Sequence, residues 1–159
     1  ISIQYNAFYE CKNLTFITIP NSVLSIGEGA FWQCKSLIYI TLPNLLTSIE
    51  RSAFAYCYNL TSTTIPNLVT SIENSAFAFC YNLTYINIPK SVTSIEYGAF
   101  DNCNCLTSIT ISDSVISIGE YAFWDCKSLT SITIPKKFEN KMKSIFKDLS
   151  KVEVTYINN

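Results

Sequence analysis

The hydrophobic positions of this chain recur at one fixed spacing, and the pair Ala-Phe marks the start of each repeat at Ala7, Ala30, Ala53, Ala76, Ala99 and Ala122. Aligned copies read A-F-x-x-C-x-x-L-T-x-I-x-I-P-x-x-V-x-S-I, followed by three variable residues. A period of about 20 to 50 residues is typical of solenoids and propellers, whose single unit is too small to bury its own apolar face. Each unit has 23 residues, which is too short for a helical hairpin or a four-stranded blade. The pattern therefore predicts a parallel solenoid.

Two extended segments are predicted in each repeat. In the fourth repeat, Ile86 and Ile88 alternate with the polar Asn87, as expected of a strand with one buried side, and Pro89 ends the segment. Residues 92–95 form a second alternating segment, after which Ala-Phe begins a compact 3₁₀ or short helical turn. Stacked repeats then form two parallel ladders with a spacing of about 4.8 Å.

The third repeat contains one departure from the apolar pattern. Thr63 stands where the other repeats place an inward isoleucine. A buried hydroxyl costs stability unless it reaches a carbonyl, so we expect the weakest stacking position of the array here.

The repeats resemble a known family. The pattern L-x-x-I-x-I-P, followed by S-V-x-S-I and A-F-x-x-C, is similar to the 23-residue leucine-rich repeats of BspA-like surface proteins over Ile1 to about Pro135. This resemblance implies a mostly β, curved, right-handed solenoid with its main parallel sheet on the concave side. It also implies a cell-surface or secreted location in bacteria or some protists, and a role in adhesion and host contact.

The pattern changes after Pro135. An apolar series with helical spacing predicts an amphipathic helix laid across the open end of the solenoid, formed by Phe138, Met142, Ile145, Phe146 and Leu149. An alternative is a basic amphipathic helix that meets a membrane or a partner. Val152, Val154 and Tyr156 alternate as a last strand. We predict a solenoid of about six repeats over 1–135, the first one truncated, and a capping helix and strand over 136–159.

Six of the seven cysteines occupy one position of the repeat, so we expect a column of buried free thiols that act as small apolar residues: Cys11, Cys34, Cys57, Cys80, Cys103 and Cys126. Their side chains point in parallel rather than toward one another, which disfavours disulfides. Structural zinc is not expected, because the chain has no histidine and no paired cysteine motif. Cys105 falls in a predicted turn near solvent, as a tolerated substitution or as a thiol that pairs between molecules.

Composition and charge exclude several classes of function. The net charge is −1, which argues against nucleic-acid binding, and no apolar run reaches the about 18 residues that span a bilayer. Residues 1–126 carry a net charge of −5 and residues 127–159 a net charge of +4, which we interpret as a solvated cap surface. No signal peptide is visible, and because the chain opens within a repeat, we expect a fragment of a longer protein.

The first segment of each repeat presents two outward columns. One column holds Phe16, Tyr39, Ser62, Tyr85, Ser108 and Ser131, and the other holds Thr18, Thr41, Thr64, Asn87, Thr110 and Thr133. This nearly uncharged, hydroxyl-rich face with three aromatic residues is a candidate binding surface for a protein or a glycan. It is equally explained as the polar side of a strand with high β-propensity.

A second set of aromatic residues follows Ala-Phe in the compact turn, namely Tyr9, Trp32, Tyr56, Tyr58, Phe79, Tyr81 and Trp124. If these turns are exposed, the aromatic residues form an edge patch that marks a contact. The alternative is that half of them fold down over the edge of the solenoid.

Catalysis is not predicted. Histidine is absent, and the carboxylates are scattered, although Glu50, Glu73 and Glu96 share one register. Such a row can bind calcium but is better explained as a solubilising edge, so no cofactor or metal is expected.

Two functions remain open. The first is a non-enzymatic scaffold that binds a protein or glycan ligand as part of a surface adhesin, and the second is a structural spacer without a ligand. The cut edge from Ile1 to Tyr5 also predicts end-to-end pairing of the chain.

Overall fold

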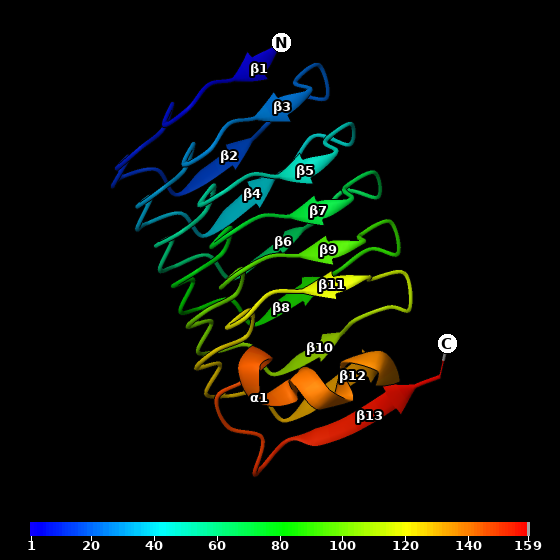
Figure 1. The fold of residues 1–159 in the computed structure, drawn as a ribbon. Coiled ribbons are helices and arrows are strands. Elements are labelled where there is room, and N and C mark those ends of the chain that lie inside the picture. Colours follow the sequence, from blue (N-terminus) through cyan, green and yellow to red (C-terminus); the bar gives the residue numbers. More distant parts are fainter. Residues whose placement is uncertain (159) are drawn as a thin grey trace.

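The computed structural model describes residues 1–158 and is a parallel β solenoid with one short helix near the carboxyl end (Figure 1). The first strand of each repeat has three or more residues: β2 (Phe16–Thr18), β4 (Tyr39–Thr41), β6 (Ser62–Thr64), β8 (Tyr85–Asn87), β10 (Ser108–Thr110) and β12 (Ser131–Pro135). The second strand has two residues: β1 (Ser2–Ile3), β3 (Ser25–Ile26), β5 (Ser48–Ile49), β7 (Ser71–Ile72), β9 (Ser94–Ile95) and β11 (Ser117–Ile118). The predicted leucine-rich-repeat solenoid is thus confirmed.

Both sets of strands stack in register. The sheet β2-β4-β6-β8 continues below as β10-β12-β13, and the second strands form the sheets β1-β3 and β5-β7-β9-β11. Every pair is parallel, and Phe16 lies opposite Tyr39, so one rung of a ladder corresponds to one repeat of the sequence. We refer to each repeat, counted from Ala7, as a coil.

The core consists of columns of equivalent residues. The consensus alanine, phenylalanine, cysteine, leucine and isoleucine side chains are buried in the inner coils. The phenylalanine column is continuous: Phe54, Phe77 and Phe100 have no exposed surface, and neighbouring rings lie 5.2 Å and 5.4 Å apart. Each coil therefore buries its apolar face against the coils above and below, as the period of the sequence predicts.

The compact turn after the second strand has 3₁₀-type hydrogen bonds but is not a continuous helix. In coil 4 the amides of Ala78 and Cys80 donate to the carbonyls of Ser75 and Phe77, at 3.1 and 3.3 Å. Two residues interrupt the helical path because they have positive φ, Ser75 at 55° and Phe79 at 60°. The same two positions of the repeat are left-handed from coil 1 to coil 6.

Thr63 finds the carbonyl that its burial requires. Its hydroxyl donates to the carbonyl of Ile40 at 3.2 Å, and only 4% of the residue is exposed. Between β4 and β6 the single registered pair is Tyr39 with Ser62, whereas the neighbouring pairs of strands share three. The ladder is therefore least regular at this rung.

We expect Thr63→Ile to stabilise the protein slightly. The added apolar surface contributes about 1.5 kcal/mol at about 0.8 kcal/mol per buried methylene, and the lost hydrogen bond offsets about 1 kcal/mol of it. Equivalent coils already hold isoleucine at this position, such as Ile40 and Ile86. Urea denaturation measures the change in free energy of unfolding, and a clear loss of stability in Thr63→Ile would contradict this interpretation of the rung.

The carboxyl-terminal segment differs in part from the predicted single helix. It contains the 3₁₀ helix η1 (Lys136–Lys141), the helix α1 (Met142–Ile145) and the strand β13 (Glu153–Ile157). The predicted stripe is buried at Phe138, Met142, Ile145 and Phe146. The helical part ends before Phe146 because this ring continues the phenylalanine column, 5.4 Å from Phe123.

Residues 145–157 accordingly form a seventh coil. Phe146 and Leu149 follow Phe123 and Cys126 by one repeat length. The predicted last strand is present as β13, which pairs in parallel with β12. Its Val154 lies opposite Ile132, where exact repetition would place Thr155, so the seventh coil is one residue shorter than the others by the time it reaches its strand.

The cysteines are free thiols. In the column, each thiol from Cys34 onward donates to the carbonyl of the phenylalanine 26 residues earlier, for example Cys80 to Phe54 at 3.2 Å. Burial raises the pKa of Cys34 to about 11 and that of Cys126 to about 12, and it raises the pKa of Cys57 well above its usual value. Cys34, Cys57, Cys80 and Cys103 are therefore buried apolar residues with a weak donor, as predicted, whereas Cys11 and Cys126, near the two ends of the column, are only partly buried.

We expect the thiols to fall into two reactivity classes. Cys11, at the first coil, and Cys105, in its turn, are partly exposed and will react with a thiol-specific reagent in the native protein. Cys34, Cys57, Cys80 and Cys103 are buried, and Cys126 is partly exposed with its pKa raised to about 12. We expect these five thiols to react far more slowly than Cys11 and Cys105 in the native protein, because burial disfavours their thiolates. Mass spectrometry of the labelled native protein identifies the sites, and rapid labelling of Cys80 would contradict the structure.

Candidate binding surfaces

The first-strand face is formed by the outward residues of β2, β4, β6, β8, β10 and β12. Its three aromatic side chains are well exposed: Phe16 at 63%, Tyr39 at 41% and Tyr85 at 58%. Thr18, Thr41 and Asn87 are exposed in the neighbouring column. The outward orientation predicted for these six residues is therefore what the structure has, whereas a binding role for them stays a prediction.

The order of residues along this face separates the aromatic side chains. Phe16 lies directly opposite Tyr39 in the ladder, and Ser62 lies between Tyr39 and Tyr85. With one rung for each about 4.8 Å, the tyrosine backbones are about 10 Å apart. Ser62 is too small to fill the space between the two rings, so each ring presents a face that no neighbouring residue of its column covers.

The first-strand face is almost free of charge. Among the outward positions of its two columns, continued to β13, the one charged residue is Glu153 at the carboxyl end. A surface with hydroxyls, amides and isolated aromatic rings makes hydrogen bonds and apolar contacts together, which is the composition of many protein contact surfaces.

The aromatic residues of the compact turns of coils 3 and 4 form a quartet of Tyr56, Tyr58, Phe79 and Tyr81. Tyr56 stacks on Phe79 with ring centroids 4.6 Å apart, and Tyr58 stacks on Tyr81 at 5.0 Å. The two stacks meet edge to face, at 6.2 Å between Tyr56 and Tyr58. Lys35 lies over the Tyr58 ring, with its ammonium 5.5 Å from the centroid.

Several ring faces of the quartet are covered by its own members. Within each stack the two rings cover one face of each other, and Lys35 lies over Tyr58, so fewer ring faces are open to a ligand than in separated rings. Tyr81 is the most exposed of the four residues, at 36%. Desolvation by burial raises the pKa of Tyr81.

Two members of the quartet occupy unfavourable backbone positions. Tyr56 and Phe79 have φ of 62° and 60°, where coils 5 and 6 have Asn102 and Asp125. The left-handed conformation costs about 1–2 kcal/mol for most residues, and asparagine and aspartate tolerate it best. The stacking of aromatic rings contributes about 0.5–1.5 kcal/mol and offsets part of this cost.

The two tryptophans of the predicted edge patch lie outside the quartet. Trp32 packs on Tyr9 at 5.4 Å and lies 6.5 Å from Tyr56. Trp124 packs edge to face on Tyr121 at 4.7 Å, in a separate group with Tyr97. Tyr97 and Tyr121 were not among the predicted residues; their positions just before each Ala-Phe pair are the variable part of the repeat, so the consensus gives no signal for them.

Other kinds of site find little support in residues 1–158. This part of the chain has no group of three or more histidine, cysteine, aspartate or glutamate residues that would hold a metal ion. It also has no helix that is long and apolar enough to span a membrane.

The repeats identify the protein family to which this chain belongs. The model of the BspA type leucine-rich repeat region, in 6 copies, matches residues 1–105 and 70–159. The chain belongs to the BspA-type leucine-rich repeat family. No curated protein sequence matches it significantly. The chain is thus a leucine-rich-repeat scaffold, a fold that is typically non-enzymatic.

Several solved bacterial leucine-rich repeat structures are similar. The T. pallidum leucine-rich repeat protein is 26% identical with a TM-score of 0.78, over 92% of this chain and 71% of that one. A leucine-rich cell surface protein from Faecalibacterium prausnitzii is 34% identical with a TM-score of 0.62, over 82% of this chain. A leucine-rich repeat protein from Eubacterium ventriosum is 28% identical with a TM-score of 0.73, over 80% of this chain. This BspA-type chain spans 42% and 34% of the latter two proteins.

Proposed function

We propose that this chain is a non-enzymatic binding scaffold that contacts a protein or glycan ligand through the first-strand face, as part of a cell-surface adhesin. The observation that carries the proposal is the exposure of Phe16, Tyr39 and Tyr85 on a face that is otherwise polar and nearly uncharged. Burial of such rings by a ligand contributes about 25 cal/mol for each Å² of apolar surface.

The aromatic residues on this face are not required by the fold. The same outward position holds serine in coils 3, 5 and 6, at Ser62, Ser108 and Ser131, and a strand forms in each of these coils as well. An exposed ring at this position adds no core contact. Contact with a ligand would explain why aromatic side chains are present at positions where the fold does not require them.

The ring arrangement favours the first-strand face over the quartet as the main contact. Tyr39 and Tyr85 flank Ser62 and leave ring faces uncovered, whereas the quartet rings cover one another. Ring faces stack on sugar rings and on apolar side chains, and the hydroxyls beside them donate and accept hydrogen bonds.

A cell-surface location is part of the proposal. It is supported by the family and by the F. prausnitzii relative, which is described as a cell surface protein. In this setting the solenoid holds the first-strand face outside the cell, and the remaining surface keeps the array in solution.

A binding screen tests the proposal. The purified chain is screened against extracellular-matrix proteins and a glycan array, together with the Tyr39→Ala/Tyr85→Ala variant. The matched control is Tyr5→Ala/Tyr97→Ala, which removes two tyrosines of 66% and 52% exposure from outside the face. We expect a ligand that the control retains and the Tyr39/Tyr85 variant loses. The absence of any ligand in both panels would favour a structural spacer instead.

A further inference from the structure

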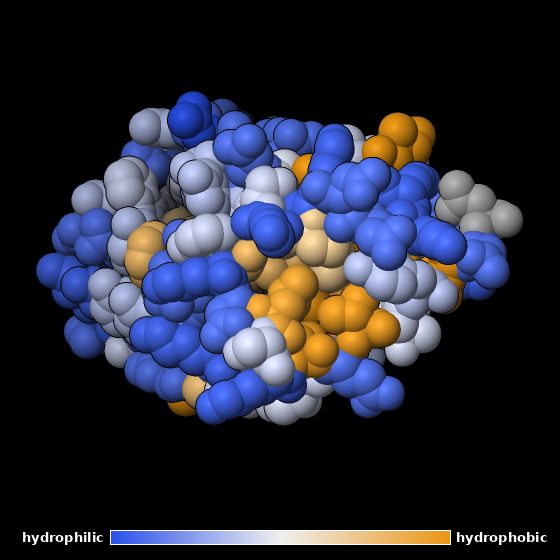
Figure 2. All heavy atoms as spheres, turned by 60° about the horizontal axis from the view of Figure 1, so that its bottom comes forward, coloured by the Kyte–Doolittle hydropathy of each residue, from blue (hydrophilic) through white to orange (hydrophobic). Residues whose placement is uncertain are grey.

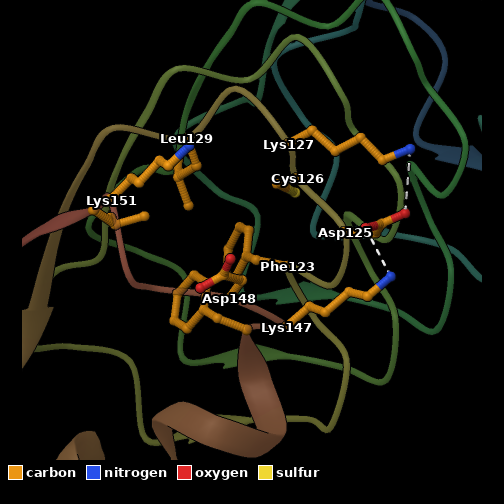
Figure 3. Close-up of a pocket in the computed structure, with 10 residues that line it drawn as sticks. Phe123, Asp125, Cys126, Lys127, Leu129, Lys147, Asp148 and Lys151 are labelled. Atoms are coloured by element: carbon orange, nitrogen blue, oxygen red, sulfur yellow. Dashed lines mark hydrogen bonds and ion pairs between the residues drawn. The ribbon is translucent and has the colours of Figure 1, made fainter.

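The carboxyl end of the solenoid contains a pocket of about 290 Å³ between coils 6 and 7 (Figure 3). Phe123, Cys126 and Leu129 of coil 6 line one side, and Phe146 and Val152 of coil 7 line the other. Figure 2, in which the carboxyl end comes forward, shows hydrophobic residues gathered into a patch that hydrophilic residues surround. The volume is close to the lower limit of small-molecule sites, about 300 Å³.

The pocket exists because coil 7 is not fully hydrogen-bonded to coil 6. From coil 1 to coil 6, a backbone bond from the second left-handed residue joins the compact turns of every neighbouring pair, for example from the amide of Asn102 to the carbonyl of Trp124 at 2.8 Å. Within residues 1–158 the corresponding bond from Asp125 to Lys147 is missing, although the Phe123 amide still donates to the carbonyl of Ile145 at 3.1 Å. Coil 7 therefore opens away from the core at this edge.

The path of coil 7 agrees with this opening. Asp125 has the left-handed φ of 52° that this position shows in coils 1 to 6, whereas Asp148, its equivalent in coil 7, does not. In place of the backbone bond, the Lys147 ammonium donates to the Asp125 carboxylate at 3.0 Å. A bond between two side chains holds the two backbones farther apart than a direct backbone bond, so the apolar side chains behind it are left uncovered.

The charges at the rim are unequal. Three lysines, Lys127, Lys147 and Lys151, face two aspartates, Asp125 and Asp148, which leaves one positive charge in excess. Asp125 is paired with both Lys127, at 3.5 Å, and Lys147. The hydrogen bond from Lys147 holds the pKa of Asp125 below its usual value. This aspartate is therefore ionised, and its carboxylate is already paired with the two lysines.

The second side of the rim provides the available donor. Asp148 accepts a hydrogen bond from the backbone amide of Ser150 at 2.8 Å, which holds its carboxylate in place. Lys151 makes no ion pair with any other residue of 1–158. Its ammonium is therefore the cation at the rim that a ligand can use, next to an apolar wall formed by Leu129 and Val152.

We propose that this pocket binds a small carboxylate with an apolar body, such as a medium-chain fatty acid. The apolar tail lies against Phe123, Phe146 and Val152, and the carboxylate accepts a hydrogen bond from Lys151. This inference is independent of the proposed function of the first-strand face, because the pocket lies at the end of the array and shares no residue with that face.

The test is a calorimetric titration of the whole chain with octanoate, octanol and octylamine, which share one tail and differ in charge. We expect octanoate to bind with one site and about ten-fold more tightly than octanol, the gain of one charge-assisted hydrogen bond. Tighter binding of octylamine, or equal binding of octanoate and octanol, would overturn the proposal.

Two variants test whether octanoate binds in this pocket. Lys151→Ala is expected to weaken octanoate binding about ten-fold, whereas Lys90→Ala, an exposed lysine outside the pocket, leaves it unchanged. Val152→Phe fills the pocket and is expected to remove binding of both octanoate and octanol. Circular dichroism shows whether each variant is folded, and octanoate binding that survives both Lys151→Ala and Val152→Phe in folded protein would contradict the assignment.

Discussion

Replacing Phe77 with alanine is expected to lower the free energy of unfolding by about 3–5 kcal/mol, which is the usual cost of removing a buried phenylalanine. Phe77 has no exposed surface and stacks between Phe54 and Phe100, with centroids 5.2 Å and 5.4 Å away. The cavity lies in the middle of the column, where the backbone of neighbouring coils cannot close it without breaking the register of both ladders. Urea denaturation followed by circular dichroism measures the loss.

Phe79→Ala is the matched control for this variant. Phe79 lies in the same turn and has the same side chain, but it is half-buried and contacts the quartet instead of the core. Its loss removes stacking worth about 0.5–1.5 kcal/mol. If the two variants lose equal stability, the phenylalanine column is not the main source of cohesion between coils.

The second expected result concerns the length of a deletion. Removing residues 76–98, which is one complete repeat, joins Ser75 to Ala99 and keeps every column in register. We expect a folded protein with a lower denaturant m-value, because less surface is exposed on unfolding. Removing residues 76–87 places the second strand of one coil where the compact turn of the next is required, and we expect this variant to be unfolded.

Circular dichroism and urea denaturation separate the two deletions. The first variant should keep a cooperative transition, since each coil depends only on its neighbours. A loss of folding in both deletions would show that the coils are not interchangeable. Survival of both would contradict the register that Phe16–Tyr39 and Ser71–Ser94 pairing defines.

Most of the fold was predictable from the period, because one physical requirement is repeated in every coil. Each consensus residue must face the same residue in the next coil, so alignment of the repeats gives the strand register, the phenylalanine column and the cysteine column together. The same reasoning located Thr63 and its need for a carbonyl, which the structure satisfies at Ile40.

The features that were harder to predict lie at positions where the repeat consensus specifies no residue. The left-handed positions hold Asn6, Ser52 and Tyr121 among others, so residue type gives little indication of backbone conformation there. The apolar series from Phe138 to Leu149 fits a helix as well as a coil, and the helical interpretation missed that Phe146 follows Phe123 by one repeat. The pocket beside it lies where one backbone bond between coils 6 and 7 is missing, which no side-chain pattern encodes.

The sequence predicted which side chains of the first-strand face point outward, but it did not predict which ligand they bind. Alternation along β2, β4 and β8 places Phe16, Tyr39 and Tyr85 outward, and the structure has them exposed. The edge aromatics could not be resolved in the same way, because their packing depends on which rings meet in neighbouring coils. Tyr56 and Phe79 meet, whereas Asp101 and Asn102 of coil 5 separate them from Trp124.

The most direct test of the binding role is a hydroxyl-radical footprint of the chain with and without the ligand that the screen identifies. Phe16, Tyr39 and Tyr85 are exposed and oxidisable, and so are Tyr5 and Tyr97 outside the face. The proposed function predicts that the ligand protects Phe16, Tyr39 and Tyr85 and leaves Tyr5 and Tyr97 as reactive as before. Protection of Tyr97 or of the quartet, with the first-strand face unchanged, would contradict it.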